Sequence, residues 1–114
     1  MGESKELPKV FDLPTVNREI GDHFFSPVDV AKVNDWVLRV AAVEGEFHWH
    51  SHDDDELFIV YEGRLYIDVD GGTLTCEKGQ GVVIPKDTRH CTRATERTLI
   101  LLFEPASLNP KGKS

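Results

Sequence analysis

Positive charge is scarce in this chain of 114 residues, which has 13 lysines and arginines against 20 aspartates and glutamates. The formal net charge of −7 argues against a nucleic-acid groove or a surface for anionic membranes, because both need clustered cations that release counterions. Cysteine is also scarce: Cys76 and Cys91 are too few for the disulfide framework of a small secreted domain. We expect both cysteines to be buried and unreactive rather than nucleophilic.

Long hydrophobic runs are absent as well. The longest, residues 57–61 and 99–103, have five apolar residues each, whereas a membrane-spanning helix needs about 20. The first residues are polar and lack the apolar stretch of a signal peptide. From these features we expect a soluble, cytoplasmic protein that binds neither nucleic acid nor a membrane.

What the sequence does contain is a series of short β-strand patterns from residue 36 onward. Leu65, Ile67 and Val69 alternate with polar residues, which is typical of a strand with one buried face. The following Asp70-Gly71-Gly72 favours a hairpin turn, because these residues tolerate positive φ angles. Strand patterns at this spacing, with hardly any helix, predict one all-β domain, either a sandwich or a barrel.

The chain is expected to have three parts: an N-terminal extension at 1–33, a barrel at 34–105 and a C-terminal tail at 106–114. Within the extension, Ser26 as N-cap and Pro27 as first residue favour a short helix over residues 28–33. The apolar segment 10–14 and the Phe24-Phe25 pair lie outside the barrel. We expect them to pack on a second copy in a homodimer; the alternative is that they fold back over their own barrel.

Three of the five histidines, His48, His50 and His52, fall in one short stretch. On a strand, residues two apart share a face, so these imidazoles would point the same way and form a surface suited to a transition metal. Glu56 and His90 can add a carboxylate and a further imidazole. Such ligands suit Fe(II), Mn(II), Ni(II), Cu(II) or Zn(II), whereas calcium and magnesium prefer oxygen ligands. A polar, solvated strand face without a metal is the alternative.

The spacing of these residues resembles the two motifs of the cupin superfamily. The first motif is matched by His50-Ser51-His52, three residues, Glu56, six residues and Gly63. The second is matched by Gly79, five residues, Pro85 and then His90. Three positions depart from the family pattern: Gly45 lies one residue closer to the histidines, Asp87 replaces the glycine before His90, and Ala94 stands where an asparagine is often found.

The resemblance implies a conical jelly-roll β-barrel that holds a divalent metal, such as Fe, Mn, Ni or Zn, through His50, His52, Glu56 and His90. His48 is outside that spacing and is predicted to line the pocket as an acid or base. The side chains of Arg64, Tyr66, Arg89 and Arg93 could orient an anionic substrate, or they could be ordinary surface residues.

A shell of three histidines and one glutamate leaves about two positions of an octahedral ion open. We therefore expect an enzyme that acts on a small molecule, with oxygenase, isomerase or hydrolase chemistry. The alternatives are a module that binds or senses a small molecule through its metal without turnover, and a purely structural metal site with a closed shell.

Overall fold

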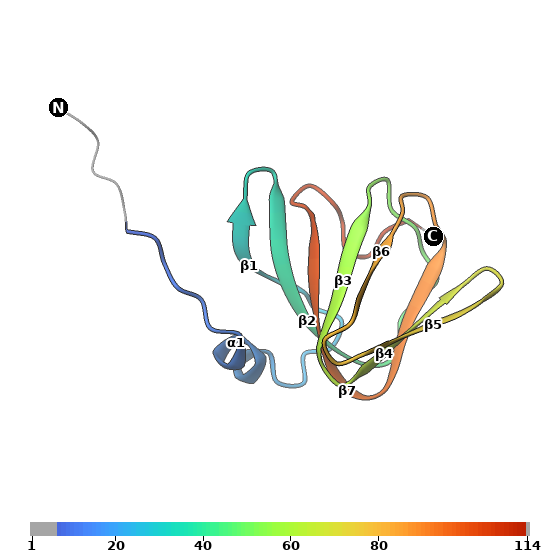
Figure 1. Cartoon of the computed structure of the whole chain (residues 1–114), viewed down its shortest axis with the longest axis horizontal. Coiled ribbons are helices and arrows are strands. Elements are labelled where there is room, and N and C mark those ends of the chain that lie inside the picture. Colours follow the sequence, from blue (N-terminus) through green and yellow to red (C-terminus); the bar gives the residue numbers. More distant parts are fainter. Residues whose placement is uncertain (1–6, 114) are drawn as a thin grey trace.

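Seven β-strands and one short helix make up the computed structural model, which describes residues 7–113 (Figure 1). In chain order, the elements are α1 (Leu13–Ile20), β1 (Val28–Val33), β2 (Trp36–Glu46), β3 (Glu56–Glu62), β4 (Arg64–Val69), β5 (Gly72–Glu77), β6 (Gly81–Ile84) and β7 (His90–Pro105). The predicted all-β class is confirmed. Within residues 7–113, no helix is long and apolar enough to cross a membrane.

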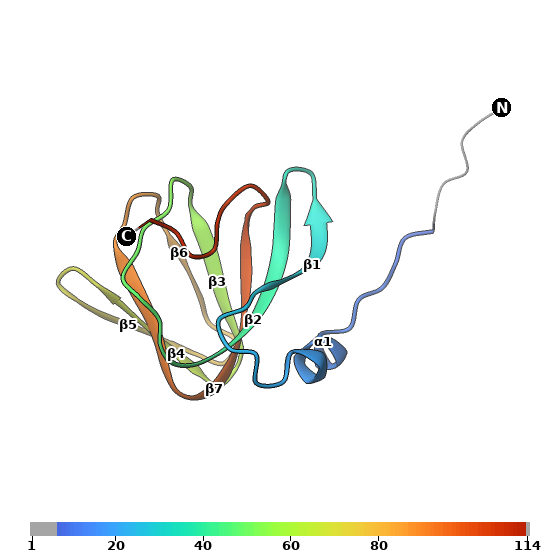
Figure 2. The ribbon, with the colours of Figure 1, turned by 180° about the vertical axis from the view of Figure 1, so that it is seen from behind.

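The strands pair in the order β1-β2-β7-β3-β6, and β4 joins β7 to β5. The long strand β7 makes this possible: its first residues pair with β4, while its later residues pair with β2 and β3. The sheet therefore bends back on itself into the two facing layers of a jelly roll (Figures 1 and 2). Among the described residues no pairing joins β1 to β6, so the expected barrel curves without closing.

The main hydrophobic core lies between the two layers. Side chains that alternate along β2, β3, β4 and β7 point into it, and among them Leu65, Ile67 and Val60 are almost completely buried. A second cluster lies on the outer side of the sheet, where Val40, Ala42 and Leu99 are covered by α1 through Ile20. Burying both faces of β2 explains why this strand is nearly continuous in apolar residues.

The predicted hairpin at Asp70-Gly71-Gly72 is confirmed. Strands β4 and β5 pair up to Val69 and Gly72, which leaves Asp70 and Gly71 as a two-residue turn. Gly71 has φ 90°, a conformation that glycine adopts without strain.

The helix predicted over residues 28–33 is wrong, because these residues form the edge strand β1. Val33 pairs with Trp36, so Asn34 and Asp35 form a tight turn between β1 and β2. Asn34 has φ 55°, a value that asparagine tolerates better than most residues. The turn and the pairing with β2 outweigh the capping signal of Ser26 and Pro27.

A helix does form earlier, where the sequence was interpreted only as an apolar segment. Helix α1 begins after Asp12, whose carboxylate accepts a hydrogen bond from the Thr15 backbone N–H at 2.9 Å. Pro14 occupies the first turn and Gly21 ends the helix with φ 57°. The N-cap aspartate, the proline in the first turn and the glycine at the end are ordinary helix signals, so this helix could have been predicted from the sequence.

For Phe24 and Phe25 the structure favours the alternative, in which they fold back over their own barrel. Phe24 joins the cluster under α1, and Phe25 packs against the main core and stacks on Phe47 at 5.0 Å between ring centroids. By contrast, Val10 and Phe11 remain exposed at the base of the N-terminal arm (Figure 1).

Candidate metal centre

Three histidines from two distant parts of the chain meet inside the jelly roll. His50 and His90 are joined by a pair of backbone hydrogen bonds, each 2.9 Å from nitrogen to oxygen. His52 follows two residues later, and one ring nitrogen from each histidine lies within 4.8 Å of the other two. All three are buried, with relative exposures of 3%, 5% and 0% for His50, His52 and His90.

His48 does not join this group. Strand β2 ends at Glu46, and the chain beyond it is irregular, so the four residues 48–51 do not alternate as a strand would. The His48 side chain is exposed, and its Nε2 is 2.9 Å from the backbone carbonyl of Lys111. The expected column of three histidines on one strand face is therefore wrong.

The backbone fixes which nitrogen of each ring faces the centre. His50 Nδ1 donates to the carbonyl of His48 at 2.9 Å, and His90 Nδ1 donates to the carbonyl of Thr88 at 2.8 Å. A carbonyl can only accept, so the proton of each neutral ring is on Nδ1 and the lone pair is on Nε2. This is the arrangement in which protein backbone orients metal-ligating histidines.

Glu56, the first residue of β3, brings a carboxylate to the same place. Its Oε1 is 3.3 Å from His52 Nε2 and 3.7 Å from His90 Nε2, and the residue is 1% exposed. These same three atoms are buried without a hydrogen-bond partner among the described residues. Unpartnered buried polar atoms are rare in folded proteins, and here they converge on one point. Imidazole nitrogens with one carboxylate oxygen fit a divalent transition metal.

Burial changes the pKa values of the three histidines and of Glu56. It lowers the pKa of His50 and His52 to about 4, with neighbouring histidines lowering both further, and it also lowers the pKa of His90. The imidazoles are therefore neutral at pH 7, as ligation requires. Burial raises the pKa of Glu56, and the adjacent Glu104 raises it further, so the carboxyl holds a proton at neutral pH until a cation offsets the cost.

The sequence analysis missed a buried ion pair behind Glu56. Glu104 is 0% exposed and is paired with Arg39, which also donates to the carbonyls of Ala106 at 3.0 Å and Leu108 at 2.9 Å. The sequence did carry a signal of this pair. Arg39 lies two residues before the inward-facing Ala41 on β2, so its side chain points to the same face of the strand. A charged residue at a core position of a strand is expected to have a buried partner.

The expected C-terminal tail folds back across the centre. We call the described part of this tail, residues 106–113, the C-terminal segment. Ser51 and Lys113 form an isolated bridge through backbone hydrogen bonds of 2.9 and 2.8 Å. Gly112 lies so close that an added Cβ would be 2.6 Å from His50 Cδ2 and 3.0 Å from His52 Cε1. The segment thus closes one side of the centre.

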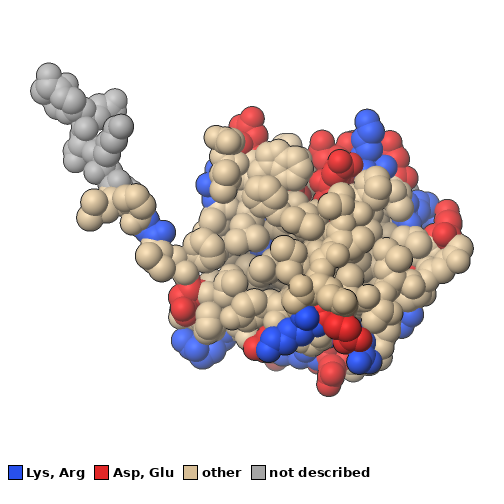
Figure 3. Space-filling model, in the orientation of Figure 1, with Lys and Arg blue, Asp and Glu red and all other residues tan. Residues whose placement is uncertain are grey.

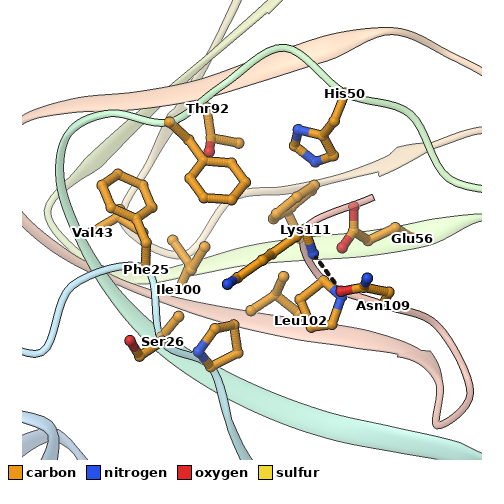
Figure 4. Close-up of a pocket in the computed structure, with 15 residues that line it drawn as sticks. Phe25, Ser26, Val43, His50, Glu56, Thr92, Ile100, Leu102, Asn109 and Lys111 are labelled. Atoms are coloured by element: carbon orange, nitrogen blue, oxygen red, sulfur yellow. Dashed lines mark hydrogen bonds between the residues drawn. The ribbon is translucent and has the colours of Figure 1, made fainter. Parts of the chain in front are cut away.

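A cavity of about 240 Å³ leads from the molecular surface to the centre (Figure 4). His50 and Glu56 lie at one end of it, and Phe25 and Ser26 lie at the other. Its walls are mostly apolar, from residues that include Phe25, Val43, Phe47, Phe58, Ile100 and Leu102. A small molecule in this cavity would reach His50 and Glu56, the two residues of the centre that line it.

The other candidate residues lie elsewhere. Of the four residues considered for substrate binding, Arg64 and Arg93 pair with surface carboxylates, and none of the four lines this cavity. Cys76 and Cys91 are free and buried, as predicted, and burial raises the pKa of both thiols. Cys91 donates to the Phe47 carbonyl at 3.4 Å.

One departure from the expected motif has a simple structural explanation. Asp87 has φ 65°, a conformation usually reserved for glycine, and its backbone N–H donates to the His52 carbonyl at 2.8 Å. Aspartate tolerates this conformation better than most residues. The turn before His90 therefore keeps its geometry without the glycine.

Fold and site together define a jelly-roll protein with a buried cluster of three histidines at the end of a small cavity. A family model of the cupin domain matches residues 36–103, and the chain belongs to this family. The predicted family and fold are thereby confirmed.

Several known proteins are similar to this chain. The uncharacterised protein YdbB of Bacillus subtilis (strain 168) is 46% identical over 77 residues, which cover 66% of this chain and 68% of YdbB. Polyketide synthase CurC of Streptomyces cyaneus is 30% identical over 116 residues, covering 94% of this chain and 75% of CurC. The crystal structure of a cupin-2 domain protein from Shewanella frigidimarina NCIMB 400 has a TM-score of 0.80 and 37% identity, covering 84% of this chain and 94% of that one.

Proposed function

We propose that this protein is a metal-dependent enzyme that acts on a small molecule. In this proposal His50, His52, Glu56 and His90 hold one divalent transition metal, with Fe, Mn, Ni and Zn as the candidates. The observation that carries it is the convergence of Glu56 Oε1 with the Nε2 atoms of His52 and His90, buried and without partners among residues 7–113.

The chain's own residues would prepare the reaction. Backbone carbonyls of His48 and Thr88 hold the rings of His50 and His90 in the metal-binding tautomer. The apolar walls of the cavity exclude water and orient the substrate, which strengthens electrostatic interactions at the centre. A bound divalent metal would supply Lewis acidity, or a site for oxygen, at the positions that four protein ligands leave open. Oxygenase, isomerase and hydrolase chemistry all fit this description.

The proposed acid or base role of His48 receives little support. Its side chain does not line the cavity, and its Nε2 is already engaged with the Lys111 carbonyl. The geometry favours a role in holding the C-terminal segment. A His48→Ala variant is accordingly expected to retain the metal.

A binding or sensing module without turnover is the second candidate. It is favoured by one observation: among the described residues that line the cavity, the only titratable side chains are His50, Glu56 and Lys111. Two of these would be occupied by the metal, which leaves few groups to move protons.

Two measurements test these candidates. In protein loaded with Co(II), added oxalate should change the visible absorption spectrum in a saturable way, because an open coordination site accepts it. An unchanged spectrum would show a closed, structural site. Fe(II)-loaded protein is then incubated in air with a panel of small carboxylic acids, with His90→Ala as the inactive control. Metal-dependent consumption of an acid supports an enzyme, and full recovery of every acid that binds supports a sensor.

We further propose that the protein acts in the cytoplasm as a homodimer. Exposed apolar side chains support the homodimer: Val10 is 98% exposed and Leu7 is 84% exposed. The outer face of the β1-β2-β7-β3-β6 sheet adds Val33 and Val83, both 54% exposed, and Figure 3 shows few charges at the centre of the face seen in Figure 1. Apolar surfaces of this kind are commonly covered by a partner.

A further inference from the structure

The cavity that leads to the candidate metal centre contains one cation. Most of its lining is apolar, and among the described residues that line it Lys111 is the only lysine or arginine and Glu56 the only acidic residue. The Glu56 carboxylate faces the histidines. The cavity thus has a centre suited to a metal at one end and a separate positive charge along its wall.

The Lys111 ammonium group has no ion-pair or hydrogen-bond partner within the part of the chain that the structure describes. Figure 4 shows its side chain extended across the cavity, between His50 and Glu56 on one side and Phe25 and Ser26 on the other. The neighbouring Lys113, in contrast, pairs with Asp53 at 2.6 Å on the surface. Lys111 is itself exposed, so its ammonium group lies where the cavity opens to solvent, and in a chain with a net charge of −7 it has no carboxylate partner among the described residues.

The backbone of Lys111 is held in place on several sides. Its carbonyl is 2.9 Å from His48 Nε2, and its N–H donates to Asn109 Oδ1 at 3.0 Å. The next residues are fixed by the close approach of Gly112 to His50 and by the Ser51–Lys113 bridge. The backbone of Lys111 is therefore positioned relative to the histidine cluster.

An exposed ammonium group attracts an anion by about 1 kcal/mol at contact distance, and this attraction is not offset here by a carboxylate beside Lys111. The aromatic rings of Phe25, Phe47 and Phe58 line the same cavity and offer surfaces for a flat apolar molecule. An apolar cavity of roughly 150 Å³ accommodates benzene. The cavity here, at about 240 Å³, has room for a single ring with one or two substituents.

We propose that Lys111 binds the anionic group of the ligand, and that the ligand is a small, mostly apolar acid with about one ring. That the other end of this acid meets a metal at His50, His52, Glu56 and His90 rests on the function proposed above. The binding of the anion by Lys111 does not depend on the metal.

The test compares benzoate with benzamide, which have similar shapes but differ in charge. Their affinities are measured by NMR titration, in metal-free and in Zn(II)-loaded protein. Lys111→Met removes the charge and keeps the apolar stem, Lys111→Arg keeps the charge, and Lys113→Met is the matched control for loss of an exposed lysine nearby. Thermal unfolding checks that all variants fold.

Wild-type protein should bind benzoate more tightly than benzamide in both metal states. Lys111→Met should weaken benzoate binding about fivefold and leave benzamide binding unchanged, while Lys111→Arg and Lys113→Met should retain the preference. The proposal is overturned if the wild type shows no preference for benzoate, or if Lys111→Met keeps that preference.

The two metal states separate this inference from the proposed function. A Lys111-dependent preference in protein that fails to bind any metal would support the inference and contradict the metal-dependent function. A protein that binds metal but shows no Lys111-dependent preference for benzoate would contradict the inference and leave the metal-dependent function standing.

Discussion

The polar atoms that converge on the candidate metal centre are the most informative residues of this protein. Each buried polar group without a partner costs about 1–3 kcal/mol of stability. Glu56 Oε1 and the Nε2 atoms of His52 and His90 are three such atoms, all within one small volume. A metal ion would turn this cost into a set of coordinate bonds, which explains why the chain tolerates the arrangement.

Metal binding should release about one proton at pH 7. Burial and Glu104 raise the pKa of Glu56, so this carboxyl must lose a proton to bind, whereas His50 and His52, with pKa values of about 4, are already neutral. Proton release is measured by calorimetric titration of Zn(II) in two buffers with different ionisation enthalpies. The matched variant Glu56→Gln should release none. Release of two or more protons would show that the histidines are charged in the metal-free protein.

The ion pair behind Glu56 should be important for stability. In Arg39→Met, Glu104 loses its cation, and two adjacent carboxyls remain buried, so we expect a loss of about 3–5 kcal/mol in the free energy of unfolding. Urea denaturation of the metal-free protein measures this. Arg64→Met, which breaks the exposed pair with Glu77, is the control and should change stability little. Equal effects of the two substitutions would contradict a buried structural role for Arg39.

At the scale of elements, the sequence predicts those helices, strands and turns that a few neighbouring residues determine. The alternation of Leu65, Ile67 and Val69 and the following glycines were sufficient for the β4–β5 hairpin, because both signals act over a few residues. Strand β1 was mistaken for a helix because its partner, β2, decides its conformation and its own sequence carries a competing cap signal. Long-range pairing is not visible in a window of six residues.

The candidate site also has one part that the sequence predicts and one part that it does not. His50, His52, Glu56 and His90 were predicted as a group from spacing, and the structure brings them together although their role as ligands remains a proposal. The contribution of the C-terminal segment could not be predicted, since its proline, glycine and two lysines have no periodicity. Its position follows from individual hydrogen bonds, such as those between Ser51 and Lys113.

Displacing the C-terminal segment should open the centre. Gly112 has φ 65°, and an added Cβ would also come within 2.6 Å of the Ser51 carbonyl oxygen, so Gly112→Ala cannot keep the segment in place. We expect faster hydrogen exchange in residues 106–113 and at the Ser51 N–H, measured by mass spectrometry or NMR. Gly71→Ala is the control, because Gly71 also has a positive φ but open space around it. Unchanged exchange in Gly112→Ala would show that the segment does not close on the histidines.

At the scale of the whole molecule, apolar side chains are exposed in two places within residues 7–113: before α1, at Val10 and Phe11, and on the outer sheet face, at Val33 and Val83. A two-fold dimer that covers them is a closed assembly, so its size should not change with concentration. Light scattering should give twice the chain mass of 12.9 kDa over a wide concentration range. Deleting residues 1–11, which leaves α1 and its N-cap Asp12 intact, should shift the protein toward monomer or aggregate. A mass of 12.9 kDa at high micromolar concentration would contradict the dimer.

The central claim is that the buried cluster holds a metal, and elemental analysis of His52→Ala tests it most directly. His52 contributes one of the unpartnered nitrogens, and its removal deletes one coordinate bond while the other residues stay in place. After identical loading with Fe(II), Mn(II), Ni(II) or Zn(II) and dialysis, the wild type should retain about one ion per chain. His52→Ala should retain little metal and still fold, and the exposed His48→Ala should bind as the wild type does. Full occupancy in His52→Ala, or none in the wild type, would contradict the metal centre described here.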